Sequence, residues 1–287
     1  MNAACPLCGG EGYRIVRAGE VGRAEPCSCQ ADCPACHGAR FVIEREGGYE
    51  VAAPCRCTGL FERIRRFNEA RLPAAYAEKR LSPASAEDHQ WFFDRGQESL
   101  KRAKHQFIRY RTAVDVDRDR GLVLVGGPGL GKTHLVCALL AHLTLGRGIA
   151  CRFVDFYQLL ARIRATFDGR GDESEQSIIE PLVETAVLVI DDLGKGQGSA
   201  WELTIIDQIV TRRYNAGRII LATTNYFPAA ELEERNTAPG AQGAARRVRH
   251  DEPLEERIGL RLVSRLRETA DFIVLSGSDF RIEGRAR

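Results

Sequence analysis

The residues of this 287-residue sequence whose types and spacing could do chemistry form two groups. The first is eight cysteines near the N-terminus, arranged as two copies of the pattern CPxC-x18-CxC that lie 28 residues apart. The second is a glycine-rich loop ending in lysine and threonine, followed along the chain by a pair of aspartates and by Thr-Thr-Asn. The first group predicts a metal centre, and the second predicts phosphate binding.

Each copy of the cysteine pattern supplies four thiols, the number that Zn2+ takes in a closed structural site. We expect one structural zinc ion per copy. A crossed arrangement, in which the outer pairs hold one ion and the inner pairs the other, fits the same spacing. With four protein ligands, neither ion would be catalytic. The ligands are Cys5, Cys8, Cys27 and Cys29 in the first copy, and Cys33, Cys36, Cys55 and Cys57 in the second.

Short alternating runs between the cysteine pairs predict a β-hairpin in each copy, turning at Gly19 in the first and at Gly47–Gly48 in the second. A unit this short has little core, so the metal would supply much of the folding free energy. Disulfides are the competing interpretation, but the N-terminus has no apolar stretch of the secretory type. A redox role for the CxxC pairs lacks the thioredoxin-like βαβ pattern around them.

The loop "GGPGLGKT" joins an apolar run, 122–125, to a stretch with leucines at helical spacing. Strand, loop and helix in this order are the setting of a phosphate-binding P-loop, in which backbone N–H groups converge on phosphate at a helix N-terminus. Lys132 would contact the β- and γ-phosphates, and the Thr133 hydroxyl would be a Mg2+ ligand. The expected nucleotide-binding residues of the loop are Gly126, Gly127, Pro128, Gly129, Leu130, Gly131, Lys132 and Thr133.

The run "VLVIDD" has four apolar residues, 187–190, as in a strand buried on both faces, and delivers two carboxylates to its C-terminal end. Asp191 is expected to hold Mg2+, largely through water, and Asp192 to orient and activate the attacking water. Many ATPases of this type have Glu at the second position, so Asp could slow hydrolysis. If the strand within 218–226 lies between the other two, Asn225 would stand near the γ-phosphate.

These motifs in this order resemble an AAA+ ATPase, and more narrowly the bacterial replicative-helicase loaders of the DnaC/DnaI type. The resemblance is carried by "GGPGLGKTH", "LVIDDLG", "TTN", "GLRLVSRL" and "VLSGSDFR". The ATPase motifs are shared with IstB-type transposition ATPases, whereas an N-terminal zinc module is typical of the loaders. The resemblance implies an α/β AAA+ fold with a parallel sheet, ATP and Mg2+ binding, self-association through the ATP site, single-stranded DNA as a ligand and a hexameric replicative helicase as partner.

Two alternatives stay open. One is an IstB-like transposition helper or another DNA-dependent ATPase. The other is a zinc adaptor whose nucleotide domain is a slow ATP switch, which the Asp at position 192 favours. A net charge of +2 does not by itself indicate a nucleic-acid binder. We therefore choose candidate DNA contacts by their place in the sequence and not by overall charge. They are Phe156, Tyr157, Arg162, Arg164 and Arg170 after the second strand, and Arg246, Arg247 and Arg249 in a later Gly/Ala-rich loop.

In "EERIGLRLVSRLRE" (255–268), Arg257, Arg261 and Arg265 recur every four residues and would share one side of a helix. The resemblance gives the arginine of "SRL", Arg265, the role of a finger that enters the ATP site of the next subunit. A solvated face is the competing interpretation. Twelve residues follow the last expected strand, 272–275, too few for a full AAA+ lid, so a neighbouring subunit would cover the ATP, and Arg281 could partly replace the arginine of that lid.

The chain is expected to contain three parts. They are a duplicated four-cysteine zinc-binding domain at 1–58, a linker with a short amphipathic helix at 59–90, and an AAA+ ATPase domain at 91–287. The composition, 44% hydrophobic and 28% charged, is that of a globular protein. With no run of about 20 apolar residues, the cytoplasm is the expected location.

Overall fold

The centre of the molecule is a five-stranded parallel sheet in the order β6-β7-β8-β5-β9. The computed structural model describes residues 5–30, 33–78, 114–167, 173–237, 252–277 and 279. The sheet confirms the expected α/β fold, and it places β8 between β7 and β5. The strands are β5 (Gly121–Val125), β6 (Cys151–Asp155), β7 (Val187–Asp191), β8 (Ile219–Thr224) and β9 (Ala270–Val274).

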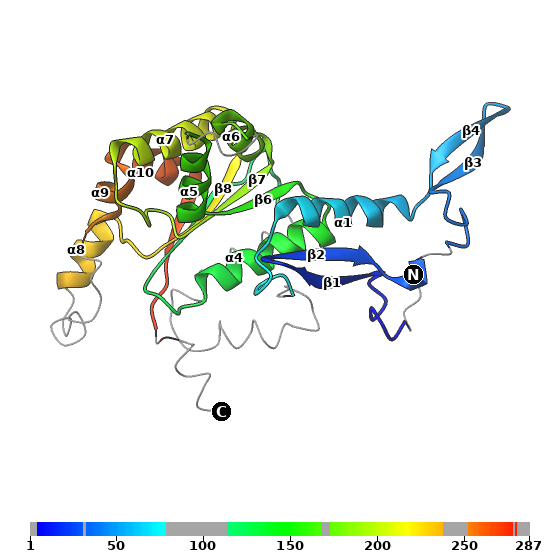
Figure 1. The fold of residues 1–287 in the computed structure, drawn as a ribbon, viewed down its shortest axis with the longest axis horizontal. Coiled ribbons are helices and arrows are strands. Elements are labelled where there is room, and N and C mark those ends of the chain that lie inside the picture. The colour runs from blue at the N-terminus through cyan, green and yellow to red at the C-terminus, as the bar shows by residue number, and fades with distance from the viewer. Residues whose placement is uncertain are drawn as a thin grey trace.

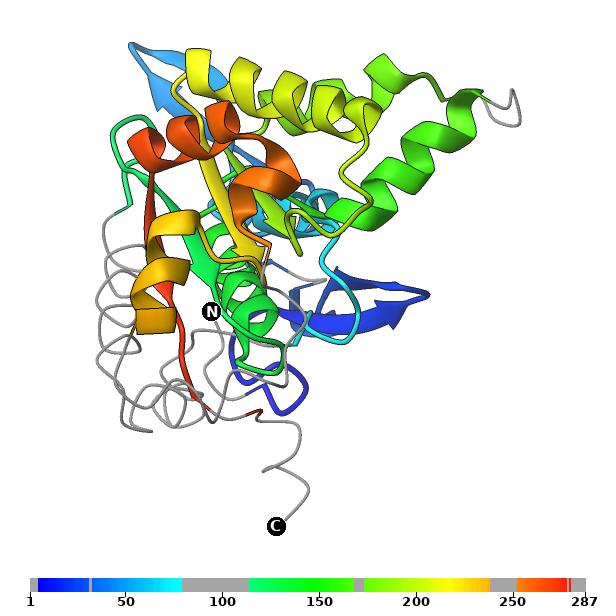
Figure 2. The same ribbon diagram turned by 90° about the vertical axis from the view of Figure 1, so that its left-hand side faces the viewer.

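Helices cover both faces of this sheet (Figures 1 and 2). Leu122 and Leu124 of β5 pack on one side, and Val123 and Val125 pack on the other, so the strand is apolar throughout. The first side is covered by α4 (Lys132–Ala141) and the π-helical turn η3 (His142–Gly146). The second is covered by α5 (Phe156–Phe167), α6 (Glu175–Glu184), α7 (Ala200–Asn215), α9 (Leu254–Ile258) and α10 (Leu260–Thr269). A further helix, α8 (Ala229–Thr237), follows β8.

Two β-hairpins precede the sheet, as the alternating runs predict. The turns lie at the expected glycines, and the second uses two consecutive positive-φ residues, Gly47 (φ 61°) and Gly48 (φ 89°), which suit the twist of a tight hairpin. The first hairpin is β1 (Tyr13–Ala18) with β2 (Val21–Pro26), and the second is β3 (Phe41–Glu46) with β4 (Tyr49–Pro54). A 3-10 turn, η1 (Ser28–Gln30), follows the first.

Helix α1 (Thr58–Ala70) binds the first hairpin to the ATPase sheet rather than acting as a loose tether. Its apolar side, including Leu60, Ile64 and Phe67, joins one buried cluster with Tyr13 and Ala24 of the hairpin and with the side chains of α4. Besides β2, the helix contacts η3 and strand β6 of the central sheet. The helix ends at Arg71 in the left-handed conformation (φ 55°).

Arg213 of α7 fixes the starts of two central strands from within the core. Its side chain is fully buried, and its guanidinium donates to the carbonyl oxygens of Leu182, Val183, Thr185, Ala186 and Ile219. Burial lowers the pKa of this guanidinium to about 9, so it stays charged at neutral pH. No helix in the described ranges is long and apolar enough to cross a bilayer.

The packing of α1 predicts that Phe67→Ala destabilises the ATPase domain and not only the N-terminal hairpin. Phe67 is fully buried, and truncation of such a side chain costs about 3–5 kcal/mol. Thermal unfolding followed by circular dichroism would show the main transition shifted downward, while Arg65→Ala on the exposed side of α1 would leave it in place. An unchanged main transition in Phe67→Ala would mean that α1 is only a tether.

Candidate nucleotide and metal sites

The glycine-rich loop between β5 and α4 has the backbone shape that a phosphate-binding loop requires. Gly129 and Gly131 have φ of 79° and 78°, in the left-handed region that favours glycine, and Gly131 directly precedes the first residue of α4. The carboxyl group of Asp279 also packs against Gly129, where a Cβ atom would lie 2.0 Å from it. The loop therefore wraps the N-terminus of α4, where N–H groups and the helix dipole favour an anion.

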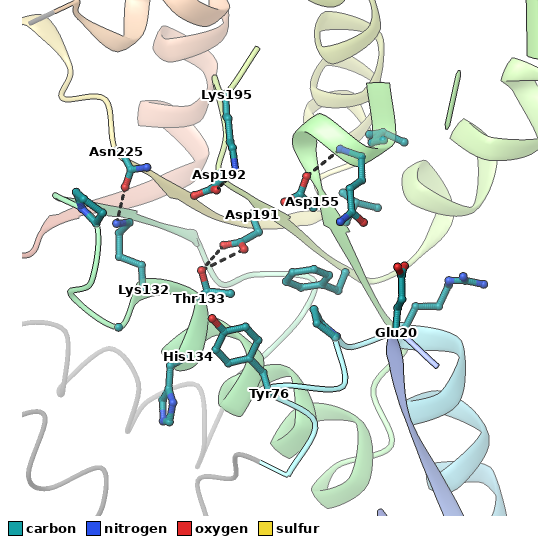
Figure 3. Close-up of a pocket in the computed structure, with 18 of the residues that line it drawn as sticks. Glu20, Tyr76, Lys132, Thr133, His134, Asp155, Asp191, Asp192, Lys195 and Asn225 are labelled. Atoms are coloured by element: carbon teal, nitrogen blue, oxygen red, sulfur yellow. Dashed lines mark hydrogen bonds and ion pairs between the residues drawn. The ribbon is translucent and has the colours of Figure 1, made fainter. Parts of the chain in front are cut away.

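The ammonium of Lys132 is held inside this loop. Its Nζ donates to the carbonyl oxygens of Gly126 (2.8 Å) and Gly127 (2.7 Å) and to the side-chain oxygen of Asn225 (2.8 Å). Asn225 thus reaches the P-loop from the end of β8, as expected if β8 lies between β5 and β7 (Figure 3). In these three bonds the buried charge rests on neutral oxygens, which phosphate oxygens would replace favourably.

Asp191 forms the second half of the site at the C-terminal end of β7. Its carboxylate accepts from the hydroxyl of Thr133 (2.9 and 3.1 Å) and from that of Thr223 (2.5 Å). Burial raises the pKa of Asp191, the hydroxyl of Thr223 lowers it in part, and the nearby carboxylate of Asp192 raises it further. A buried carboxylate bonded to hydroxyls and set among further carboxylates has the chemistry of a Mg2+ site, in which Thr133 and Asp191 would hold the ion.

Asp192 lies beside this pair in a left-handed backbone conformation (φ 53°). Its backbone N–H donates to the Thr223 hydroxyl (3.0 Å), and its carboxylate pairs with Lys195 (2.9 Å). That bond raises the pKa of the Lys195 ammonium. The expected water-activating carboxylate is therefore engaged by a lysine in this arrangement. Lys195 was not expected at the site; it stands three residues after Asp192, a spacing that alone says nothing about contact.

These residues line one cavity of about 1100 Å3, large enough for a nucleoside triphosphate (Figure 3). The cavity has two further contributors that the sequence interpretation missed. Asp155 lies opposite Asp191 in the sheet register and ends its own strand, so the rule that located Asp191 could have located it. The other wall comes from the first hairpin turn and the segment after α1, and contains Glu20, Val21, Arg71, Pro73 and Tyr76. Only packing between distant segments brings this wall to the P-loop.

The arginine row is divided between two helices, contrary to the expectation of one continuous helix. Gly259 (φ 89°) separates α9 from α10, because a left-handed glycine interrupts the helical path. Arg257 on α9 donates to the carbonyl oxygens of Gly194 and Gly196, in the loop after Asp192. It therefore braces its own chain and does not share a side with the other two.

Arg265 is held within its own chain by α7. Its guanidinium donates to Asp207 (3.2 Å) and to the hydroxyl of Thr211, and its side chain is 17% exposed. It does not line the cavity of its own chain, so its part in a neighbour's site stays a prediction. Arg261, one turn earlier, is exposed.

The described part of the expected DNA-contacting segment is mostly occupied by internal contacts. Phe156 is buried in the core and so is not available to DNA, whereas Tyr157 is exposed. Arg162 pairs with Glu173, and Arg164 lies over the Trp201 ring and near Glu202. Arg170, Arg246, Arg247, Arg249 and Arg281 lie outside the described residues.

The eight N-terminal thiols gather into two sets, each within one repeat. In each set the four sulfur atoms lie within 4.8 Å of one another, so the structure favours the arrangement within repeats over the crossed one. The closest Sγ–Sγ pairs are 3.6–3.8 Å apart, and all eight cysteines are free. Tetrahedral Zn–S bonds of about 2.3 Å place sulfurs about 3.8 Å apart. The residues therefore fit zinc.

The backbone around the thiols also suits metal binding. The N–H groups of Ala35 and Cys36 lower the pKa of the Cys33 thiol, and the N–H of Cys29 lowers that of Cys27. These bonds stabilise thiolate, which is the form that binds zinc. Burial and the other thiols of the set raise the pKa of Cys57, and in Cys29 they outweigh the hydrogen bond from Gln30, which lowers its pKa.

Comparison with known proteins shows related sequences and folds. The family of IstB-like ATP-binding proteins matches residues 78–232, more than half of the chain. The replicative helicase loader DnaC of Escherichia coli strain K12 is 34% identical over 103 residues, 36% of this chain and 41% of that protein. DnaC of Buchnera aphidicola subsp. Baizongia pistaciae is 34% identical over 96 residues, 33% of this chain and 39% of that protein. The chain thus matches about two fifths of the length of these relatives.

Solved structures extend the likeness to the fold. A crystal structure of the DnaC helicase loader has 28% identity and a TM-score of 0.50, covering 63% of this chain and 92% of that one. A DnaI structure has 17% identity and a TM-score of 0.52, covering 75% of this chain and 98% of that one, and shows likeness of fold alone.

The thiol geometry predicts two zinc ions per chain, and the cavity wall predicts that the first ion matters to nucleotide binding. Elemental analysis of reduced protein purified without added metal should give a ratio of zinc to protein near two.

Cys27→Ser, which removes a ligand of the first set, should weaken binding of a fluorescent ATP analogue, because the turn at Glu20 and Val21 lines the cavity. Cys55→Ser in the second set is the matched control. A zinc ratio near zero, or equal nucleotide affinity in both variants, would contradict these two expectations.

The raised pKa of Asp191 predicts that Asp191→Asn stabilises the protein without nucleotide or Mg2+ at pH 7. Because the folded pKa exceeds the unfolded one, stability falls as pH rises between the two values, and at neutral pH the buried charge is a net cost. Differential scanning fluorimetry should show the melting temperature raised by about 1–4 °C, with the gain lost at acidic pH and no gain from Mg-ATP.

Asp192→Asn is the control for this prediction. Asp192 is only partly buried and is paired with Lys195, so its removal should give no such rise. A lower melting temperature in Asp191→Asn at pH 7 would show that the carboxylate is not a net cost.

Proposed function

This chain belongs to the family of IstB-like ATP-binding proteins, and we propose that it is an ATP-dependent loader of a hexameric replicative helicase. In this proposal it binds Mg-ATP in the P-loop cavity, self-associates through that site and grips single-stranded DNA, in the cytoplasm. The proposal is supported first by the convergence of Lys132, Thr133, Asp191, Asp192 and Asn225 on one cavity. It is supported also by the similarity of the chain to DnaC helicase loaders.

The residues of the cavity have distinct roles in the proposed hydrolysis. The P-loop N–H groups and Lys132 bind the β- and γ-phosphates, and Lys132 exchanges its bonds to Gly126 and Gly127 for bonds to phosphate. Thr133 and Asp191 hold Mg2+, which when bound draws charge from the phosphate oxygens. Asn225, already beside the ammonium of Lys132, contacts the γ-phosphate or the attacking water.

Asp192 is the proposed group that orients and deprotonates the attacking water, and Lys195 controls its availability. The ammonium of Lys195 occupies an oxygen of this carboxylate, so Asp192 must leave Lys195, or share it, to accept a proton from water. This ion pair favours a slow basal rate that a partner, DNA or a neighbouring subunit could raise. It is also the observation that keeps the slow ATP switch as a second candidate.

The family match itself supports a further candidate, an IstB-like transposition helper, because the matched residues contain the P-loop and most of the sheet. The two functions share the nucleotide chemistry and differ in partner. A pull-down of purified chain against the purified replicative helicase from the same cell separates them. Retention of a hexameric helicase in an ATP-dependent manner supports the loader, and absence of any retention removes it in favour of the helper.

The role of Asp192 predicts that Asp192→Asn binds ATP normally and loses hydrolysis. The change keeps the shape of the side chain and removes the base, whose contribution is about 10²–10⁴ in rate. Lys195→Ala is the matched variant, because it frees the carboxylate, and its basal rate should rise. A phosphate-release assay with and without single-stranded DNA measures both. Hydrolysis by Asp192→Asn at the wild-type rate would assign the base elsewhere.

If Arg265 enters the ATP site of a neighbouring subunit, two variants that are each inactive should restore hydrolysis when they are mixed. Arg265→Ala should bind ATP but lose hydrolysis and ATP-dependent assembly, because the guanidinium would leave Asp207 and Thr211 to meet a neighbour's phosphates. Mixing it with Lys132→Ala should restore activity, since intact pockets would then meet intact arginines. Arg257→Ala, which braces its own loop, should give no rescue in the same mixture. Normal hydrolysis by Arg265→Ala alone would make this arginine structural.

A further inference from the structure

The two N-terminal hairpins are copies of one unit with different surroundings. The 28-residue offset pairs Tyr13 with Phe41, Ile15 with Ile43, Ala24 with Ala52 and Pro26 with Pro54. In both hairpins the strand register puts these four positions on one face, because residues directly opposite in an antiparallel pair share a face. The same apolar face therefore occurs twice in the chain.

In the first hairpin this face is covered by α1. Tyr13 and Ala24 are buried in one cluster with Leu60 and Ile64 of the helix. Asn68 completes the contact at the open edge of β2, where its side chain accepts from the N–H of Ala24 (2.7 Å) and donates to its carbonyl oxygen (3.0 Å). An amphipathic helix with one carboxamide thus satisfies both the face and the edge of this unit.

In the second hairpin the equivalent face is bare. Phe41 is 50% and Ile43 is 58% exposed, and within the described residues no side chain bonds the backbone of Ala52. Four of the eight exposed large apolar side chains in the described ranges belong to this hairpin: Phe41 and Ile43 on this face, and Tyr49 and Val51 on the opposite one. Figure 1 shows β3 and β4 extending from the start of α1, away from the sheet.

We propose that the face of the second hairpin formed by Phe41, Ile43, Ala52 and Pro54 docks an amphipathic α-helix of a partner protein. The first hairpin, which α1 covers, indicates the chemistry of that helix. It presents aliphatic or aromatic residues at the spacing of Leu60, Ile64 and Phe67, followed by a carboxamide that bonds the edge of β4 at Ala52. The proposal is independent of the ATPase role, because it rests on the comparison of the two hairpins.

Two features restrict the occupant. In the first unit Ala77 packs directly on Gly22, because a Cβ atom added to Gly22 would lie 1.9 Å from the Cβ atom of Ala77. In the second unit the position equivalent to Gly22 is Glu50, whose carboxylate pairs with Arg45. The docked helix must therefore lie on the half of the hairpin near the cysteines. A second copy of the chain is disfavoured, because its own α1 is buried against its own first hairpin.

The test uses α1 itself as the probe. A fluorescent peptide of residues 58–72, stapled between positions 65 and 69 on its exposed side, is titrated into the full zinc-loaded chain. Fluorescence anisotropy should show saturable binding. Ile43→Thr should weaken it by about tenfold, because an apolar contact is lost. Val51→Thr is the matched control on the opposite face of the same hairpin, and it should leave the affinity unchanged.

Three outcomes would overturn the proposal. The first is the absence of saturable binding, and the second is an equal loss in Ile43→Thr and Val51→Thr, which would place the peptide elsewhere. The third is a wild-type dimer in size-exclusion chromatography that Ile43→Thr converts to monomer, which would make a second copy the occupant. Weaker binding in Ile43→Thr alone, with both variants monomeric, supports the partner helix.

Discussion

The buried carboxylate of Asp191 is the constraint on which the nucleotide site depends. A charge in this position is tolerated only if something compensates for lost water, and here the hydroxyls of Thr133 and Thr223 do so in part. One hydroxyl comes from the P-loop helix and the other from β8, so the carboxylate joins three elements. The strand order, with β8 between β7 and β5, is what makes this contact possible. A divalent cation would compensate the rest of the charge of Asp191. The ion that serves the nucleotide would therefore also stabilise the fold.

The opposite charge at the site is handled in a similar way. Lys132 rests on loop carbonyls and Asn225, and Lys195 rests on Asp192. Both ammonium groups are held by partners that phosphate or water can replace. The cavity is thus arranged for exchange of ligands. Its remaining wall comes from the first hairpin and the segment after α1, so the first four-cysteine unit borders the P-loop cavity.

Much of this arrangement could be predicted from local sequence. The P-loop, the aspartate pair and the thiol sets each have a spacing that few other structures require, and the glycines at 47 and 48 identified a turn. Long-range packing could not be predicted. Nothing near Glu20 or Tyr76 signals proximity to the P-loop, because α1 brings them there by packing on η3 and β6. The prediction that one continuous helix carries the three arginines was wrong for a local reason. Gly259 takes a left-handed conformation, which the spacing of the arginines does not reveal.

We infer that this cavity binds a nucleoside triphosphate through Lys132 together with a divalent cation. Isothermal titration calorimetry of the zinc-loaded chain with ATP, in the presence and absence of Mg2+, tests it most directly. We expect one site per chain that requires Mg2+ for full affinity and is lost in Lys132→Ala, while Lys195→Ala retains it. ATP binding that depends neither on Mg2+ nor on Lys132 would show that the nucleotide does not bind in this way.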